Sequence, residues 1–255
     1  MKEFSFRSLS EYLEITSSLP ELFACHPSDI WFRGIKDTEM KLVPGVVWRG
    51  MCEEREESAI SEFLTYCQNY HGKKETNAYE LYALMQHYGL PTRLLDWSLS
   101  PLVSLYFALE QDNEEGAQRA VWSMAPYDLN NKTMDFAGII MPSEFNQSMV
   151  GLYLPKYLRI EHDPVPSQAA AISLPFTNQR VKSQKGAFTI HGYNNLPLDE
   201  IFSSYGLNNI ACIKLESEEY RSRLLNQLYS IGMKEDDIYQ DLNSLSKRIL
   251  RELGI

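Results

Sequence analysis

Residues 86–109 read QHYGLPTRLLDWSLSPLVSLYFAL, and this stretch contains the clearest changes of local structure in the chain. A helix predicted from Asn77 to about Tyr88 should end at Gly89, because a glycine commonly follows the last helical turn. A proline, here Pro91, often comes just beyond it. The residues that follow, 92–97, are predicted to form an extended or irregular connector.

A second helix is predicted from about residue 101 to residue 110. Ser100-Pro101 has the pattern of an N-cap residue followed by a proline in the first helical turn. From Leu102 to Leu109 the helix is apolar on nearly every side, which is typical of a helix that is buried all round. We therefore expect this helix at the centre of the molecule.

The rest of the pattern predicts helices around several short strands. A capping-box pattern at Ser8–Glu11 predicts the start of a helix over about 9–19. Pro20 is not expected to extend this helix. Further helices are expected at 54–70 and as a C-terminal pair at about 217–253, with strands at 30–32, 119–124, 157–161, 187–191 and 210–215. Helices that enclose non-local strands predict the α+β class, as a single compact domain over 1–255 with a mixed or antiparallel sheet.

Composition narrows the functional classes. The net charge of −10 disfavours a nucleic-acid partner without excluding one, because every phosphate contact needs a local cation. The four cysteines are scattered and form no CxxC pair, so neither a zinc site nor a disulfide framework is predicted. No run of ~18 apolar residues and no signal-like N-terminus is present, so we expect no membrane partner and a cytoplasmic location.

The first candidate site is WFRG, residues 31–34. Arg33 follows a short apolar strand and precedes Gly34, which permits a ligand or another strand to approach closely. The rigid fork of a guanidinium suits the binding of phosphate or carboxylate, so Arg33 is a candidate anion-binding residue. A structural salt bridge, to Asp37 or to a more distant carboxylate, is the alternative.

The second candidate site is the polar cluster within residues 86–97. Side chains flanked by buried helices must find partners in the protein, in water or in a ligand. Arg93 and Asp96 could pair with each other, or Asp96 could lie at the N-terminus of the following helix. In either arrangement Asp96→Ala is predicted to destabilise the fold. His87 is either a catalytic residue or a hydrogen-bonded core residue. The candidate ligand-binding residues of this cluster are Tyr88, Thr92, Arg93, Asp96 and Trp97.

These motifs resemble the FRG-domain family over about residues 8–250. The resemblance rests on WFRG with Leu42-Val43-Pro44 and Arg49, on residues 86–109, on Asn178-Gln179-Arg180 with Ser183–Phe188, and on LYSIGM at 228–233. Ile238–Leu242 departs from the phenylalanine-proline step expected in the family. The resemblance implies a protein of bacterial and phage conflict, such as a toxin or a phage-defence effector.

The strand–Arg–Gly arrangement is also similar to the first motif of arginine-type ADP-ribosyltransferases. That similarity implies an ADP-ribosyltransferase-like fold, with NAD as substrate, no metal, and an unknown macromolecular acceptor. Arg33 would grip NAD, Ser183 and Gln184 would shape the pocket, and Glu218 would stabilise the ribosyl cation. Ser217 alternatively caps the next helix, with Glu218 in its first turn.

Two other functions are also compatible with the sequence. One is a metal-independent nuclease or RNA-acting toxin that uses His87, Arg93 and Asp96, or His191, for acid–base chemistry. The other is a non-catalytic interaction module in which the same arginines only support the core. We expect Arg33, His87, Arg93 and Asp96 to border one concave site, with Trp97 or Tyr88 as a wall.

Overall fold

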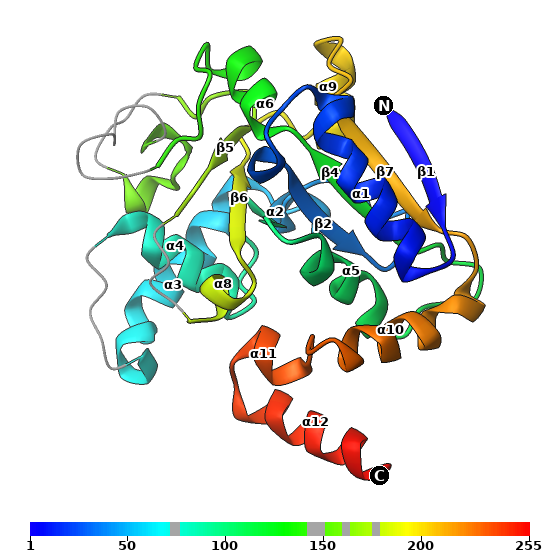
Figure 1. The fold of residues 1–255 in the computed structure, drawn as a ribbon. Coiled ribbons are helices and arrows are strands. Elements are labelled where there is room, and N and C mark those ends of the chain that lie inside the picture. Colours follow the sequence, from blue (N-terminus) through cyan, green and yellow to red (C-terminus); the bar gives the residue numbers. More distant parts are fainter. Residues whose placement is uncertain (72–76, 142–150, 160–163, 175–178) are drawn as a thin grey trace.

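The fold is an open, mixed sheet with helices around it (Figure 1). The computed structural model describes residues 1–71, 77–141, 151–159, 164–174 and 179–255. Seven strands lie in the order β1-β7-β4-β2-β3-β6-β5, and only β1 and β7 run parallel. The strands are β1 (Lys2–Phe6), β2 (Trp31–Ile35), β3 (Leu94–Ser98), β4 (Ala120–Met124), β5 (Ala170–Ile172), β6 (Gly186–Ile190) and β7 (Ile210–Leu215).

Helices cover both faces and one end of the sheet. In Figure 1, α5 lies against β2, α3 and α4 lie near the β5–β6 end, and α11 and α12 extend below α10. The helices are α1 (Leu9–Phe23), α2 (Gly45–Trp48), α3 (Glu53–His71), α4 (Ala78–His87), α5 (Pro101–Glu110), α6 (Pro126–Thr133), α8 (Gln179–Ser183), α9 (Leu198–Ser204), α10 (Arg221–Ser230), α11 (Glu235–Tyr239) and α12 (Leu242–Leu253). Short 3₁₀ helices include η1 (Pro27–Asp29), η2 (Gly151–Tyr153), η3 (Lys156–Leu158) and η4 (Glu218–Tyr220).

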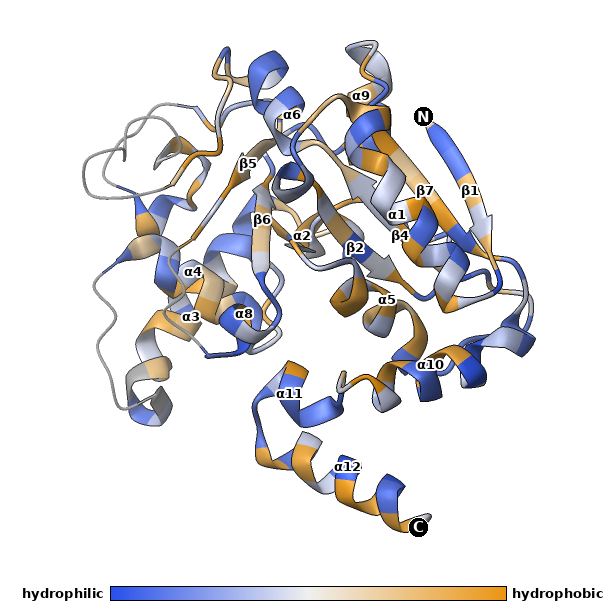
Figure 2. Ribbon diagram, in the orientation of Figure 1, coloured by the Kyte–Doolittle hydropathy of each residue, from blue (hydrophilic) through white to orange (hydrophobic). Residues whose placement is uncertain are grey.

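The core divides between the two faces of the sheet. Successive side chains of a strand point to opposite faces, so Phe32 packs with α1, α5 and α10, whereas Trp31 and Ile35 pack in a second cluster beneath α9. A third cluster joins α3 and α4 to β5 and β6. Figure 2 shows apolar residues concentrated on the inner strands and on α5.

Gly34 allows α5 to pack directly on β2. A Cβ at this position would lie 1.9 Å from the main-chain oxygen of Ser104 and 2.7 Å from the nitrogen of Ala108. Both atoms belong to the backbone of α5 and cannot rotate away. The close neighbour of this glycine is therefore a helix, rather than the ligand or strand considered from the sequence.

The sheet is weakly joined between β2 and β3. Strands β2 and β4 pair over five positions, as do β3 and β6, but β2 and β3 share only the pair Phe32–Ser98. Beyond that pair the two strands diverge toward Arg33 and Asp96. Both strands line the site described below, which lies at this divergence.

The structure confirms the α+β class and the buried helix 101–110, whose cap is Ser100 as predicted. The predicted strands at 119–124, 187–191 and 210–215 correspond to β4, β6 and β7, and the strand predicted at 30–32 corresponds to β2. Gly89 has a positive φ of 86°, as its position after α4 requires.

Several local predictions were wrong. The connector at 92–97 contains strand β3, and β1 and β5 were not predicted. The strand predicted at 157–161 is a 3₁₀ turn at its start, while residues 160 and 161 lie outside the described part of the chain. Helix α1 continues through Pro20 because Leu19 and Phe23 are buried in the core. The C-terminal pair of helices is three helices, α10, α11 and α12.

Candidate functional site

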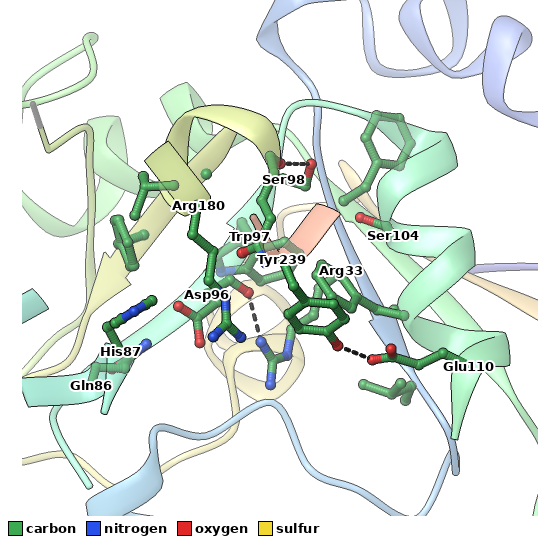
Figure 3. Close-up of a pocket in the computed structure, with 18 of the residues that line it drawn as sticks. Arg33, Gln86, His87, Asp96, Trp97, Ser98, Ser104, Glu110, Arg180 and Tyr239 are labelled. Carbon is green, nitrogen blue, oxygen red and sulfur yellow. Dashed lines mark hydrogen bonds between the residues drawn. The ribbon is translucent and has the colours of Figure 1, made fainter. Parts of the chain in front are cut away.

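A pocket of about 340 Å³ lies where β2 and β3 diverge. Side chains reach it from these strands and from α4, α5, α8 and α11, so elements from the first half and the end of the chain meet there. Figure 3 shows the polar side chains that converge on it. They include Arg33, His87, Asp96, Glu110, Arg180 and Tyr239.

Arg33 is half-buried and spans the gap between the two strands. Its Nη1 donates a 2.7 Å hydrogen bond to the main-chain oxygen of Asp96. Among the described residues no carboxylate forms an ion pair with Arg33, so the salt bridge to Asp37 considered above is not formed. Burial lowers the pKa of Arg33 while the charge of Asp96 raises it. The guanidinium remains protonated near neutral pH, because its ordinary pKa is far above that range.

Asp96 presents an exposed carboxylate to the same pocket. No side-chain hydrogen bond to it is found within the described residues, and Ser100 rather than Asp96 caps α5. The two structural roles expected for Asp96, as a partner of Arg93 or a support of the helix end, are therefore both wrong. Burial lowers the pKa of both Arg33 and His87, and the charge of Asp96 partly opposes that lowering.

Glu110 and Tyr239 form a hydrogen-bonded pair on the opposite wall (Figure 3). Burial raises the pKa of the Glu110 carboxyl, although the hydrogen bond from Tyr239 opposes that shift. The guanidinium of Arg180 lies 4.7 Å from the centre of the Tyr239 ring, a cation–π contact. Neither Glu110 nor Tyr239 was among the site residues predicted from the sequence. The available signals were a carboxylate ending an otherwise apolar helix and the departure from the family pattern at Ile238–Leu242.

Two buried polar atoms of the pocket have no hydrogen-bond partner in the described protein. They are Nε2 of Gln86 and Oγ of Ser104, and both residues line the pocket. Buried polar groups are nearly always hydrogen-bonded, because an unmade bond costs about 1–3 kcal/mol. A polar ligand in the pocket would supply the hydrogen bonds that these two atoms lack.

The other predicted residues of this pocket have mainly supporting contacts. His87 lines it, and burial followed by the charge of Arg180 lowers the His87 pKa. Trp97 borders the pocket, but its indole is buried and Nε1 donates to Thr189. Gln184 lines the pocket, whereas Ser183 does not and donates to the main-chain oxygen of Ile238. Asn178 lies outside the described residues.

Arg93 does not join the pocket. It forms a two-bonded pair with Glu56, with nitrogen–oxygen distances of 3.1 and 2.7 Å, and it also donates to the main-chain oxygen of Gly192. Thr92 is buried and donates to the side chain of Gln86. Tyr88 points to a different groove and is 65% exposed. The structure thus brings Arg33, His87 and Asp96 together, but not Arg93.

Glu218 also lies away from the pocket. Both of its carboxylate oxygens accept hydrogen bonds from the buried Arg119, at 2.8 and 2.9 Å. Ser217 caps η4 by accepting from the nitrogen of Glu219, which is the helix-cap alternative considered above. This arrangement gives Glu218 a structural role, so a carboxylate beside Arg33 has to come from another residue.

The fold and the site together define an α+β protein with a mixed sheet and an arginine-containing pocket at the divergence of two strands. Residues 28–117 match the family model of the FRG domain, which confirms the resemblance seen in the sequence over that part of the chain. The matched region includes Arg33, His87, Asp96 and Glu110. Neither the comparison with curated proteins nor that with solved structures gave a significant match.

Among the described residues, no group of three or more His, Cys, Asp or Glu side chains is placed to hold a metal ion. Within the same residues, no helix is long and apolar enough to cross a membrane.

Proposed function

We propose that this pocket binds NAD and breaks the bond between nicotinamide and ribose, passing ADP-ribose to water or to a macromolecular acceptor. The observation that carries the proposal is the Arg33 guanidinium, which lines the pocket without a carboxylate partner among the described residues. One donor holds the backbone of Asp96, and the others are available for a phosphate. A charge-assisted, two-bonded contact of this kind is a strong way to hold a pyrophosphate.

The carboxylate of the reaction is Asp96 in this proposal, in place of Glu218. As the carbon–nitrogen bond breaks, nicotinamide leaves with the bonding electrons and positive charge develops on the ribose. An exposed, unpaired carboxylate in the same pocket stabilises that charge. Water or the acceptor then attacks the ribosyl carbon and gives up a proton. His87 is suited to accept it, because burial lowers its pKa and favours the neutral imidazole.

The unpartnered atoms of Gln86 and Ser104 support a polar ligand in the pocket. The nuclease alternative is less well supported, because His191 is buried outside the pocket and Arg93 is occupied by Glu56. Arg93 does behave as the interaction-module hypothesis expects, as a structural residue. That hypothesis becomes the conclusion if NAD neither binds nor reacts.

The test is calorimetry with NAD together with an assay of nicotinamide release, on wild type and on Arg33→Lys. Lysine keeps the charge but cannot hold Asp96 and a phosphate at once, so activity should fall roughly a hundredfold while the protein stays folded. Arg223→Lys, an exposed arginine outside the pocket, is the matched control and should leave activity unchanged. No binding and no turnover in wild type, with protein and nucleic-acid acceptors present, would overturn the proposal.

A further inference from the structure

A second hollow, of about 540 Å³, lies between α3 and α4. The side chains from α3 recur every three or four residues and therefore form one stripe along the helix. We call this hollow the α3–α4 groove. It is lined from α3 by Ala59, Glu62, Phe63, Tyr66, Cys67 and Tyr70, and from the region of α4 by Leu84, Tyr88 and Leu90.

Three tyrosines of the groove are largely exposed. Tyr70 is 90% exposed, Tyr88 65% and Tyr66 57%, whereas Ile60, Tyr82 and Met85 are the buried residues that pack these helices onto the core. The exposed rings are thus not needed to hold the two helices to the sheet. Aromatic side chains gathered on one exposed hollow are typical of a surface that binds another protein.

The groove lies on a strongly acidic helix. Glu53, Glu54, Glu57 and Glu62 form no ion pair among the described residues, and Arg55 is the one arginine or lysine in α3. Glu56 is already neutralised by Arg93. Of these glutamates, Glu62 lines the groove itself. An apolar hollow with an exposed, unpaired carboxylate in its lining complements a segment that has apolar residues on one side and basic residues beside them.

The groove adjoins the candidate active pocket through two consecutive residues. The rings of His87 and Tyr88 are in edge-to-face contact, with centroids 4.8 Å apart. His87 lines the pocket that holds Arg33, and Tyr88 lines the groove. A segment bound in the groove would therefore bring its protein next to that pocket.

We propose that the α3–α4 groove is the docking site for a basic, amphipathic helix of a partner protein. Its apolar face would lie on the tyrosines and a basic residue beside that face would lie against Glu62, as in other helix-in-groove complexes. The identification of this partner as the acceptor of ADP-ribose rests on the function proposed above. Docking itself needs no NAD.

The probe is a fluorescein-labelled synthetic helix of about 16 residues, with leucine on one face and lysine at the positions that flank it. Anisotropy should show saturable binding that weakens with salt, since the attraction is partly between exposed charges. The same peptide with glutamate in place of lysine should not bind. The double variant Tyr66→Ser/Tyr70→Ser, and separately Glu62→Lys, should bind at least about tenfold more weakly.

Tyr205→Ser removes an exposed tyrosine outside the groove and is the matched control. Circular dichroism establishes that each variant is folded. The proposal is overturned if the groove variants bind as well as wild type, if the control loses as much affinity, or if the glutamate peptide binds equally. It is also overturned if wild type forms a dimer that the double variant abolishes, because a second copy would then occupy the groove.

Calorimetry with NAD on the same samples separates the two proposals. Peptide binding without NAD binding leaves the docking site intact and removes the transferase function. NAD turnover without any saturable peptide binding supports the transferase function and removes the docking site.

Discussion

Arg33 and Asp96 are joined by a single hydrogen bond of 2.7 Å, from the guanidinium of one to the main-chain oxygen of the other. The bond crosses the point where β2 and β3 diverge and connects the two most distinctive motifs of the sequence. Because it uses the carbonyl, it leaves the Asp96 carboxylate and most guanidinium donors facing the pocket. Cation and anion are thus held close together without neutralising each other in an ion pair.

Replacing Asp96 with asparagine should separate stability from function. The carboxylate is exposed and without a side-chain partner in the described structure, so the free energy of unfolding should change by less than about 0.5 kcal/mol. Inorganic pyrophosphate should bind more tightly, since a negative charge beside Arg33 is removed, while nicotinamide release should fall. Urea denaturation and calorimetry measure the two effects. A loss of more than about 1 kcal/mol would restore the structural role first expected for Asp96.

Gly34→Ala should destabilise the protein by about 3 kcal/mol or more. The added methyl group would meet the backbone of α5 at 1.9 Å, and either the helix or the strand must move. Gly45→Ala is the control, because its nearest neighbour would be the Cα of Pro91 at 3.3 Å. Urea midpoints that fall equally in both variants would show that α5 does not depend on this contact.

Arg93→Ala should cost about 3–5 kcal/mol of stability, because it leaves the carboxylate of Glu56 buried without a cation. Adding Glu56→Gln to that variant should recover part of the loss. Asp112→Ala breaks an exposed pair with Arg221 and should cost at most about 1 kcal/mol. A double-mutant cycle measures the coupling energy between Arg93 and Glu56. Losses of stability that simply add up in the double variant would show that the two residues act independently.

His191 should make the fold sensitive to acid. Burial, followed by the charges of Arg33 and Arg93, lowers its pKa from 6.5 to about 3. The folded state therefore resists protonation that the unfolded state accepts. The stabilising effect is present above pH 6.5 and is lost as the pH falls toward 3, at about 1.4 kcal/mol per pH unit.

Urea denaturation at pH 7 and pH 5 should show wild type losing about 2 kcal/mol more than His191→Gln over that interval. The comparison with the variant removes the contribution of the carboxylates, which titrate in both proteins. Parallel profiles would mean that His191 becomes protonated in the folded state.

Local signals made part of this fold predictable. The caps at Ser100 and Asn77 and the apolar run of α5 lie within a few residues of the elements they define. Strand β3 was missed because Leu94–Ser98 is short and carries Asp96, so its strand character comes from pairing with β6. Pairing partners from distant parts of a chain leave no signal in a single short stretch.

The candidate site was predictable only where a motif contained it. Arg33, His87 and Asp96 stand in unusual local patterns, but the pairing of Glu110 with Tyr239 depends on how α11 docks. Glu218 shows the opposite failure, since the similarity to the ADP-ribosyltransferases implied a catalytic role for it. Its actual partner is Arg119, which lies 99 residues earlier and is completely buried. The spacing of residues along the sequence does not reveal an ion pair between residues that are so far apart.

The pairing of β1 with β7 has a consequence for the order of folding. Lys2–Phe6 is synthesised before the other six strands, yet its neighbour in the sheet is Ile210–Leu215, the last of the seven strands in sequence order. Such a contact closes a very long loop, which is slow and entropically costly. We expect β1 to be among the last strands to dock, because its partner β7 must be synthesised before the sheet can be completed.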